Sequence, residues 1–467
     1  KELVHKEDSE GFAGAGFATG DAATLGEDWP SLCKALDFVV TDGDPVRITQ
    51  AASFQAAGAF SGVRTGACGE TAARWLPWAA VLHGLPGVWC GPLIGGTEAA
   101  MSPEGQPAPW FAALSGEMAR LNDGGLGALL LAAAPDASAP AVFASEASRL
   151  LNECDPRFDV SMHDEEARWL RLFLRFGCTP RFVTADDLAK TDKRPPLLAL
   201  PLARALSDAD IAAIRRYVEA GGWLIADVAP GVCDEHGVSR ATGGLDDVFG
   251  TQRNGAPAKT VLEKTHVEVA VEGKMRKADL PTITADASVP GAWLRTGPDG
   301  HALLLNHILP EQFSGAEDWC AALAAFARAA GCAPCVEAEV KKGVFQGELF
   351  RFSYGGAKIV AALTDTDAGE QKLRLKLDKK SNVYNPLTGA RMSNPAKLNV
   401  TLPPGGVCCF TELPYTVETI SVLVPDAVLA GSRLVAKITV AAKKAKAGDH
   451  LVTLEDRKST RLNSSHT

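Results

Sequence analysis

The feature that most constrains the fold of this 467-residue chain is a strand–helix–strand pattern between residues 197 and 228. A short apolar run, LLALP (197–201), precedes Ser207 and Asp210, whose spacing is typical of a capping box at the start of a helix. Apolar residues then recur three and four positions apart, at Ile211, Ile214, Tyr217 and Val218. The unbroken apolar run WLIADV (223–228) follows a Gly pair. Such a run is typical of a strand covered on both faces, so the pattern predicts a parallel sheet between two helical layers.

The same alternation extends to both sides of this unit. Helices are expected at 163–176 and 316–330. Further buried strands are expected at AVFAS (141–145), PRFVT (180–184) and HALLLN (301–306). Strands that alternate with helices predict an α/β fold, here a doubly wound parallel sheet over residues 138–334.

The first 137 residues also show alternating strand and helix patterns, but fewer of them. ALDFVVTD (35–42) and VRITQAASF (46–54) are strand-like, and residues 73–90 are expected to form a helix that leads to a strand. About three units are present, which is too few to close a (β/α)8 barrel.

The pattern changes to period two after Pro334, which predicts a small all-β unit over 335–416. Another β segment begins at Val417, and we expect 417–455 to be the start of an Ig-like module. The last twelve residues, 456–467, resemble a translated sequencing adapter and are not expected to be part of the fold. We therefore expect the chain to be a fragment, open at both ends.

Composition excludes several classes of partner. The net charge of −9 gives no basic surface for a nucleic acid. No apolar run approaches the roughly 18 residues of a membrane span. The 11 cysteines are odd in number and scattered through apolar segments, and Cys332-Ala-Pro-Cys335 lacks a second ligand pair, so we expect no metal site.

Familiar catalytic and cofactor motifs are missing or out of context. GAGFATG (14–20) matches a dinucleotide loop by its letters, but the polar run KELVHKEDSE precedes it instead of a buried strand, so no cofactor is expected. The turn after WLIADV is where an α/β enzyme can carry a nucleophile, and its tip is Ala229. Because a methyl group cannot attack a substrate, this turn is interpreted as scaffolding.

Three segments resemble glycoside hydrolase family 42, the β-galactosidases. Residues 197–237, with the strand AVFAS, look like the family's trimerisation domain, which has a flavodoxin-like, class I glutamine-amidotransferase fold without the catalytic Cys. VLHGLPGVWCGPLIGGTEAAM (81–101) is similar to the last barrel strand, and 381–415 resembles a small C-terminal β domain. The resemblance implies the end of a (β/α)8 barrel at 1–137, a trimerisation domain at 138–334 that forms a homo-oligomer, and a carbohydrate substrate.

The family's chemistry implies two carboxylates at the carboxyl ends of barrel strands, acting by a retaining mechanism. The acid/base Glu, on strand four, is expected upstream of Lys1. The nucleophile is expected near ITQAASFQAAG (48–58), which contains no carboxylate, and Gln55 cannot form a glycosyl ester. No catalytic residue is therefore assigned in this chain.

Glu98, Trp89 and Asp42 are the candidate sugar contacts. A carboxylate accepts hydrogen bonds from hydroxyl groups, and an indole stacks on the apolar face of a pyranose. Asp42 and Asp44 also fit the interpretation of solvated loop acids, and Met101 stands where the family has a His. The longer parent protein of which this chain would be a fragment is expected to hydrolyse terminal β-linked sugars, and the fragment itself is expected to be inactive. The alternative is a non-catalytic carbohydrate-binding or oligomerisation scaffold with a degenerate barrel.

Overall fold

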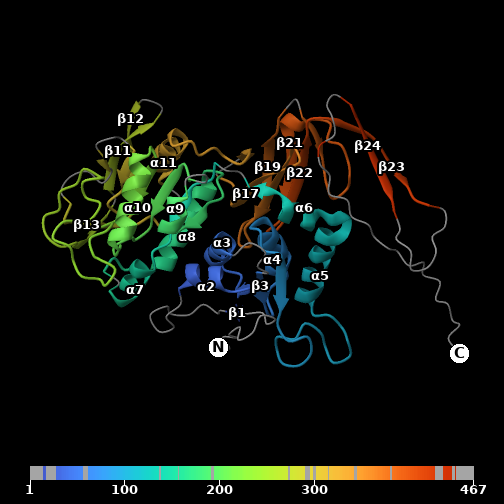
Figure 1. Ribbon diagram of the computed structural model, residues 1–467, viewed down its shortest axis with the longest axis horizontal. Coiled ribbons are helices and arrows are strands. Elements are labelled where there is room, and N and C mark those ends of the chain that lie inside the picture. The colour runs from blue at the N-terminus through green and yellow to red at the C-terminus, as the bar shows by residue number, and fades with distance from the viewer. Residues whose placement is uncertain are drawn as a thin grey trace.

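The computed structural model contains parallel and antiparallel sheets with helices packed on them (Figure 1). It describes residues 14–16, 28–55, 61–135, 138–155, 157–190, 194–263, 265–271, 274–289, 295–297, 301–313, 315–340, 344–378, 381–425, 435–443 and 448. No helix in these ranges is long and apolar enough to cross a bilayer. The adapter-like residues 456–467 lie outside them.

The N-terminal sheet has four parallel strands in chain order, β1-β2-β3-β4. Its strands are β1 (Gly14–Gly16), β2 (Phe38–Thr41), β3 (Gly62–Thr65) and β4 (Gly87–Cys90). The helices between and after them are α2 (Trp29–Ala35), α3 (Pro45–Phe54), α4 (Glu70–Leu82), α5 (Pro109–Asn122) and α6 (Leu126–Ala132). The expected alternation is confirmed, although the sequence reading missed β3.

The predicted strand at 46–54 is wrong, because this segment is the helix α3. The Asp44 side chain accepts a hydrogen bond from the Arg47 N–H at 3.0 Å, and Pro45 occupies the first helical position. Val46 and Ile48 have strand propensity, but both are buried on the packed side of the helix, where tertiary contacts outweigh intrinsic preference. The Asp-Pro pair was the available signal for a helix start.

The central sheet has six strands in the order β14-β15-β9-β8-β6-β7. They are β6 (Ala141–Phe143), β7 (Arg181–Val183), β8 (Leu197–Leu200), β9 (Trp223–Ala226), β14 (Arg295–Thr296) and β15 (Ala302–Leu304). Only β14 is antiparallel to its neighbour. The five parallel strands follow the order 2-1-3-4-5, which is that of flavodoxin-like sheets.

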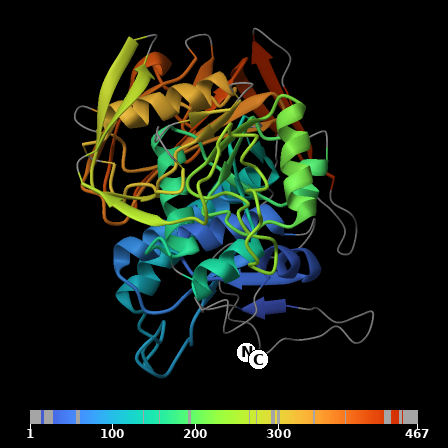
Figure 2. The same cartoon turned by 90° about the vertical axis from the view of Figure 1, so that its left-hand side faces the viewer.

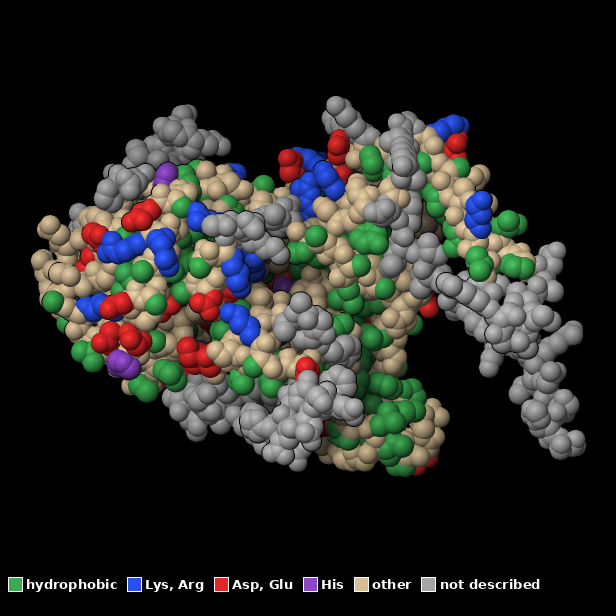
Figure 3. All heavy atoms as spheres, in the orientation of Figure 1, with side chains coloured by type: hydrophobic (Ala, Val, Ile, Leu, Met, Phe, Trp, Pro, Cys, Tyr) green, Lys and Arg blue, Asp and Glu red, His purple; other side chains and the backbone are tan. Residues whose placement is uncertain are grey.

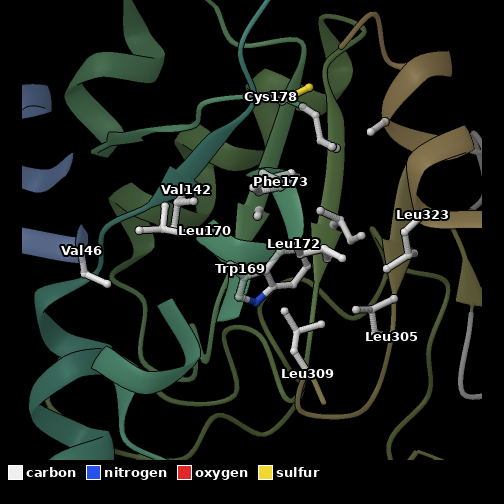
Figure 4. Close-up of a cluster of buried hydrophobic side chains, with 14 of the residues drawn as sticks. Val46, Val142, Trp169, Leu170, Leu172, Phe173, Cys178, Leu305, Leu309 and Leu323 are labelled. Carbon is white, nitrogen blue, oxygen red and sulfur yellow. The ribbon is translucent and has the colours of Figure 1, made fainter. Parts of the chain in front are cut away.

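Helices cover both faces of this sheet, as alternate strand residues predict. Val142, Ala199 and Ile225 pack with α8 (Met162–Arg175) and α11 (Glu317–Ala329), whose buried side chains appear in Figure 4. Leu198, Leu200 and Leu224 face α9 (Ala185–Ala189) and α10 (Asp208–Glu219). In Figure 2, α10 and α11 lie to opposite sides of the strands.

The remaining elements of this region are α7 (Glu146–Cys154), β10 (Lys259–Leu262), β11 (Thr265–Val271), β12 (Lys274–Leu280) and β13 (Ile283–Asp286).

The C-terminal β unit consists of two antiparallel sheets, β20-β22-β18-β17-β5 and β16-β19-β21. Their strands are β16 (Glu337–Val340), β17 (Gly347–Tyr354), β18 (Ala357–Thr364), β19 (Gln371–Lys376), β20 (Asn382–Tyr384), β21 (Leu398–Leu402), β22 (Val407–Leu413) and β5 (Ala134–Pro135). One face of the larger sheet, including Val360 and Phe410, packs on the smaller one. Its other face, including Phe350 and Ile359, packs on α4 and α6. β5 precedes the central sheet in the chain and β17 follows it, so no local sequence pattern could indicate that these two strands pair.

A two-stranded antiparallel sheet of β23 (Thr416–Leu423) and β24 (Lys437–Lys443) follows. Ile420, Val422 and Leu423 are exposed on it. Its strands belong to the segment 417–455 that the sequence predicts to be the start of an Ig-like module, a prediction that stays untested.

Candidate functional site

The N-terminal sheet has one face covered by helices and a second face that carries aromatic and charged side chains. Val39 and Val63 are buried among residues of α2, α3 and α4. The alternate residues point the other way, and there the indole of Trp89 stacks on the ring of Phe38, with centroids 6.0 Å apart and planes 24° from parallel. Trp89 remains 40% exposed. An exposed, rigidly held indole is a suitable surface for the apolar face of a sugar.

Gly62 makes room for this indole. A Cβ at residue 62 would lie 2.5 Å from the Gly87 carbonyl oxygen and 2.8 Å from Nε1 of Trp89. Any side chain here would displace the strand or the ring. Glycine at this point of β3 is therefore what lets Trp89 reach across β3 to Phe38 on β2.

The carboxyl ends of β2, β3 and β4 form one edge, where the predicted site residues gather. Asp42 directly follows β2, and its Oδ1 accepts a hydrogen bond from the Asp44 N–H at 3.3 Å. Asp44 caps α3 and binds Nε2 of His163 at 3.2 Å, so its role is structural. Asp42 and Trp89 are thus placed at one edge of the same sheet.

Glu98 reaches the same edge from the loop after β4. Backbone hydrogen bonds hold this loop, from Ala100 to Pro92 and from Met101 to Leu93. The loop brings the Glu98 carboxylate over β3, since a Cβ at Gly66 would lie 3.0 Å from its Oε2. Glu98 is exposed and has no hydrogen-bond or ion-pair partner among the described residues, so its oxygens are available as acceptors.

Arg64 is the residue that sequence reasoning missed. It pairs in register with Trp89, and because it alternates with the buried residues Val63 and Thr65 it lies on the same face as the indole. Arg64 is exposed and has no hydrogen-bond or ion-pair partner among the described residues. The signal was present in GVRT, a β-branched run with one cation, but β3 itself was not predicted.

No carboxylate replaces the expected strand-seven nucleophile. Residues 48–54 of the predicted segment are helical, and 56–60 lie outside the described residues. Gln55 ends α3, and its Nε2 donates to the Gly84 carbonyl at 3.1 Å. Two thiols lie near the edge, but burial and the neighbouring Cys68 raise the pKa of Cys90, which keeps it protonated at neutral pH.

The turn after β9 presents no reactive group. Ala229 adopts a left-handed backbone with φ of 49° and is fully buried. Phe158, Val232 and Ile308 pack around it, so apolar side chains fill the space where a substrate would bind. The part of the chain that the structure describes contains no cluster of three His, Cys, Asp or Glu side chains able to hold a metal, and β1 is the described part of the Gly-rich segment.

A pair of buried acids lies at the end of β9 and was not predicted. Asp227 accepts hydrogen bonds from the N–H groups of Leu202 and Val228 and from the Trp169 indole. Burial raises the pKa of Asp227 to about 7. Burial and then the Asp227 charge raise the pKa of Glu165 well above its ordinary value, while the Leu309 N–H holds its Oε1 at 2.8 Å. Both acids therefore hold their protons to a higher pH than exposed carboxyl groups do.

The sequence matches no protein-family profile and no curated protein. The fold, in contrast, is that of the glycoside hydrolase family 42 β-galactosidases. The chain aligns with the β-galactosidase from Bacillus circulans sp. alkalophilus at a TM-score of 0.62 and 15% identity, covering 82% of this chain and 61% of that one. A catalytic mutant of Gan42B, a GH42 β-galactosidase from G. stearothermophilus, gives 0.61 and 13%, with 82% and 61% covered.

The β-galactosidase from the haloarchaeon Halorubrum lacusprofundi gives a TM-score of 0.56 at 16% identity, with 85% of this chain and 62% of that one covered. The chain therefore spans about three fifths of the length of these enzymes. At such identities the similarity defines a glycoside-hydrolase-like scaffold, and chemistry has to be argued from the site.

Proposed function

We propose that this chain binds the terminal sugar of a saccharide at the edge formed by Asp42, Trp89 and Glu98, as part of a hydrolase that cleaves terminal β-linked sugars. The observation that carries this proposal is the indole of Trp89, held by Phe38 and the glycine of β3 with 40% of its surface exposed. Stacking orients the sugar ring, and the two carboxylates accept hydrogen bonds from its hydroxyl groups. Barrel enzymes place their sites at this end of the strands.

The proposed hydrolysis follows the two-carboxylate retaining mechanism, with galactosides as the first substrates to test. One carboxylic acid protonates the leaving oxygen, and the second carboxylate attacks the anomeric carbon. Neither role is assigned in this chain, so the chain alone is proposed to bind sugar without cleaving it. Residues 1–137 are proposed as the end of the barrel, 138–334 as a trimerisation domain of amidotransferase-like fold, 335–416 as a small β domain and 417–455 as the start of an Ig-like module.

Calorimetric titration of the full chain with methyl β-galactoside tests the binding proposal. Trp89→Ala is expected to weaken binding by about twofold to tenfold, since stacked aromatic contacts contribute about 0.5–1.5 kcal/mol. Leu423→Ala, which removes an exposed apolar side chain from β23, is the control and leaves binding unchanged. Equal affinity of the Trp89→Ala variant and the wild-type chain would contradict the proposal, as would the absence of binding.

A non-catalytic carbohydrate-binding or oligomerisation scaffold is the second candidate. The observation that favours this scaffold is that β3 places Arg64, and no acid, on the face of the sheet that carries Trp89. An assay of nitrophenyl β-galactoside hydrolysis by the parent protein distinguishes the two functions. Turnover supports the enzyme, and saccharide binding without turnover supports the scaffold. Light scattering tests the proposed trimer, which has three times the chain mass of 49.0 kDa.

A further inference from the structure

We infer that Arg64 selects saccharides that carry an anionic group, a carboxylate or a sulfate ester, on the sugar that stacks on Trp89. This inference rests on the proposed sugar site and names the class of ligand that the site prefers. It follows from where Arg64 lies, from its unused donors and from the acids around it.

The backbone fixes Arg64 beside the stacking surface. It is the register partner of Trp89 in the parallel pair of β3 and β4. Both flanking residues, Val63 and Thr65, are buried, which anchors the strand on the helices while the guanidinium extends from the opposite face. Gly62, one step back on that face, adds no side chain between Arg64 and the indole. A sugar ring on Trp89 is therefore a direct neighbour of the guanidinium.

The guanidinium has donors to spare. Arginine presents five N–H groups in a planar fork, and those of Arg64 have no partner among the described residues. Arg74, in contrast, pairs with Glu70 at 2.9 Å, and Arg215 pairs with Asp247 at 2.6 Å. A neutral hydroxyl accepts singly from such a fork, whereas a carboxylate or sulfate accepts two parallel hydrogen bonds.

The acids near Arg64 do not neutralise it by direct contact. Thr41 pairs with Val63, so Asp42 lies at the level of Arg64, but its Oδ1 accepts from the Asp44 N–H in its own turn. Glu98 lies over Gly66, beyond Arg64 toward the edge. Neither acid forms an ion pair with Arg64 within 4.0 Å. The edge therefore offers acceptors for hydroxyl groups on both sides of one cation, which suits a sugar with a single anionic substituent.

The loop that carries Glu98 adds exposed apolar residues, seen in the lobe below α5 in Figure 3, and no further cation.

Calorimetric titration of the full chain tests the inference with three probes: methyl β-galactoside, its 6-sulfate and methyl β-galacturonide. The two anionic probes are expected to bind about fivefold more tightly than the neutral one, the upper end for an exposed ion pair. Arg64→Gln is expected to remove this preference, because the amide can still donate to a hydroxyl group but lacks the charged fork. Raised salt should reduce the preference in the wild-type chain. Arg74→Gln, on the helical side, is the control and keeps the preference.

The outcomes separate the inference from the proposed function. Tighter binding of one anionic probe alone supports the inference and identifies the group as sulfate or carboxylate. Equal binding of all three probes, or a preference that survives Arg64→Gln, overturns the inference and leaves the sugar site intact. Binding of none of the three overturns both. Circular dichroism of Arg64→Gln, matched to the wild-type spectrum, excludes misfolding as the cause of a lost preference.

Discussion

Single side chains decide the chemistry available at each candidate position. The turn after β9 has the backbone strain of a catalytic turn, with φ of 49° at Ala229, yet it carries a buried methyl group. The edge formed by β2, β3 and β4 differs from this turn, because its side chains Trp89, Arg64 and Glu98 are exposed and polar or aromatic. Exposure and unused hydrogen-bonding capacity, and not backbone strain, therefore distinguish the binding candidate.

The buried pair of Glu165 and Asp227 predicts a pH-dependent stability at the residue scale. Asp227 keeps its proton up to about pH 7 in the folded chain, whereas an unfolded aspartic acid loses it near pH 3.9. The folded chain binds more protons in this window, so the free energy of unfolding decreases as the pH rises through it. Glu165→Gln supplies a permanent N–H donor to Asp227, and we expect it to stabilise the chain by about 1–2 kcal/mol at pH 8 and little at pH 5.

Urea unfolding of both chains at pH 5 and pH 8 measures this difference. Glu219→Gln, at an exposed position at the end of α10, is the control and changes neither value. A Glu165→Gln chain that is destabilised equally at both pH values would contradict this pH dependence.

At the scale of elements, the start of α3 couples a helix cap to a neighbouring helix. Asp44 caps α3 and binds His163 at the start of α8. Burial alone would raise the pKa of Asp44, but the hydrogen bonds from His163 and the Arg47 N–H outweigh it and lower the pKa. The hydrogen bond to Asp44 raises the pKa of His163 in turn. This contact helps to place α3 against the helices of the central sheet.

The contact predicts that Asp44→Ala destabilises the chain more at pH 6 than at pH 9. The carboxylate contributes above its ordinary pKa, and the imidazolium contributes below 6.5 and is lost as the pH rises through its raised folded pKa. We expect a loss of about 1 kcal/mol from the cap at both pH values and about 0.5–1 kcal/mol more at pH 6. Asp28→Ala removes the cap of α2, which has no His partner in the described part of the chain, so its cost in thermal unfolding should be the same at both pH values. A pH-independent cost for Asp44→Ala would contradict the coupling.

At the scale of the whole molecule, the β unit and the N-terminal sheet share a packed interface. The larger C-terminal sheet packs on α4 and α6, and β5 joins it from the N-terminal side. Within this interface Nε2 of His83 binds Oε2 of Glu348 at 2.8 Å, with 7% and 4% of the side chains exposed. Unlike parts joined by a flexible linker, these regions are expected to unfold together.

His83→Ala is expected to destabilise the molecule by about 3 kcal/mol, because it leaves a buried acid without its partner. Glu348→Gln keeps a hydrogen bond to the imidazole and should cost under about 1 kcal/mol. Guanidinium unfolding followed by tryptophan fluorescence gives both values. Separate transitions for the two regions in the wild-type chain would contradict the expected joint unfolding.

The sequence predicted those elements whose identity rests on local pattern. The capping box of Ser207 and Asp210, the apolar face of α10 and the buried runs of β8 and β9 form as predicted, because burial on both faces leaves its mark on the chain itself. Asp42 was a candidate from its place after a strand, whereas Trp89 and Glu98 were candidates from the resemblance to the family's last barrel strand, together with their residue types. The local pattern predicted a strand at α3, because strand-forming residues lie in this helix. It predicted no strand at β3, because this short apolar run is interrupted by an arginine.

Only the tertiary structure decided what those residues meet. The pairing of β5 with β17, the electrostatic coupling of the buried Glu165 to Asp227, and the place of Arg64 beside Trp89 all join positions that no periodicity connects. Periodicity reports which face of an element is buried, whereas register and partner choice are set by non-local packing. The sequence alone therefore determined the layers of this protein, and the fold determined the composition of its candidate site.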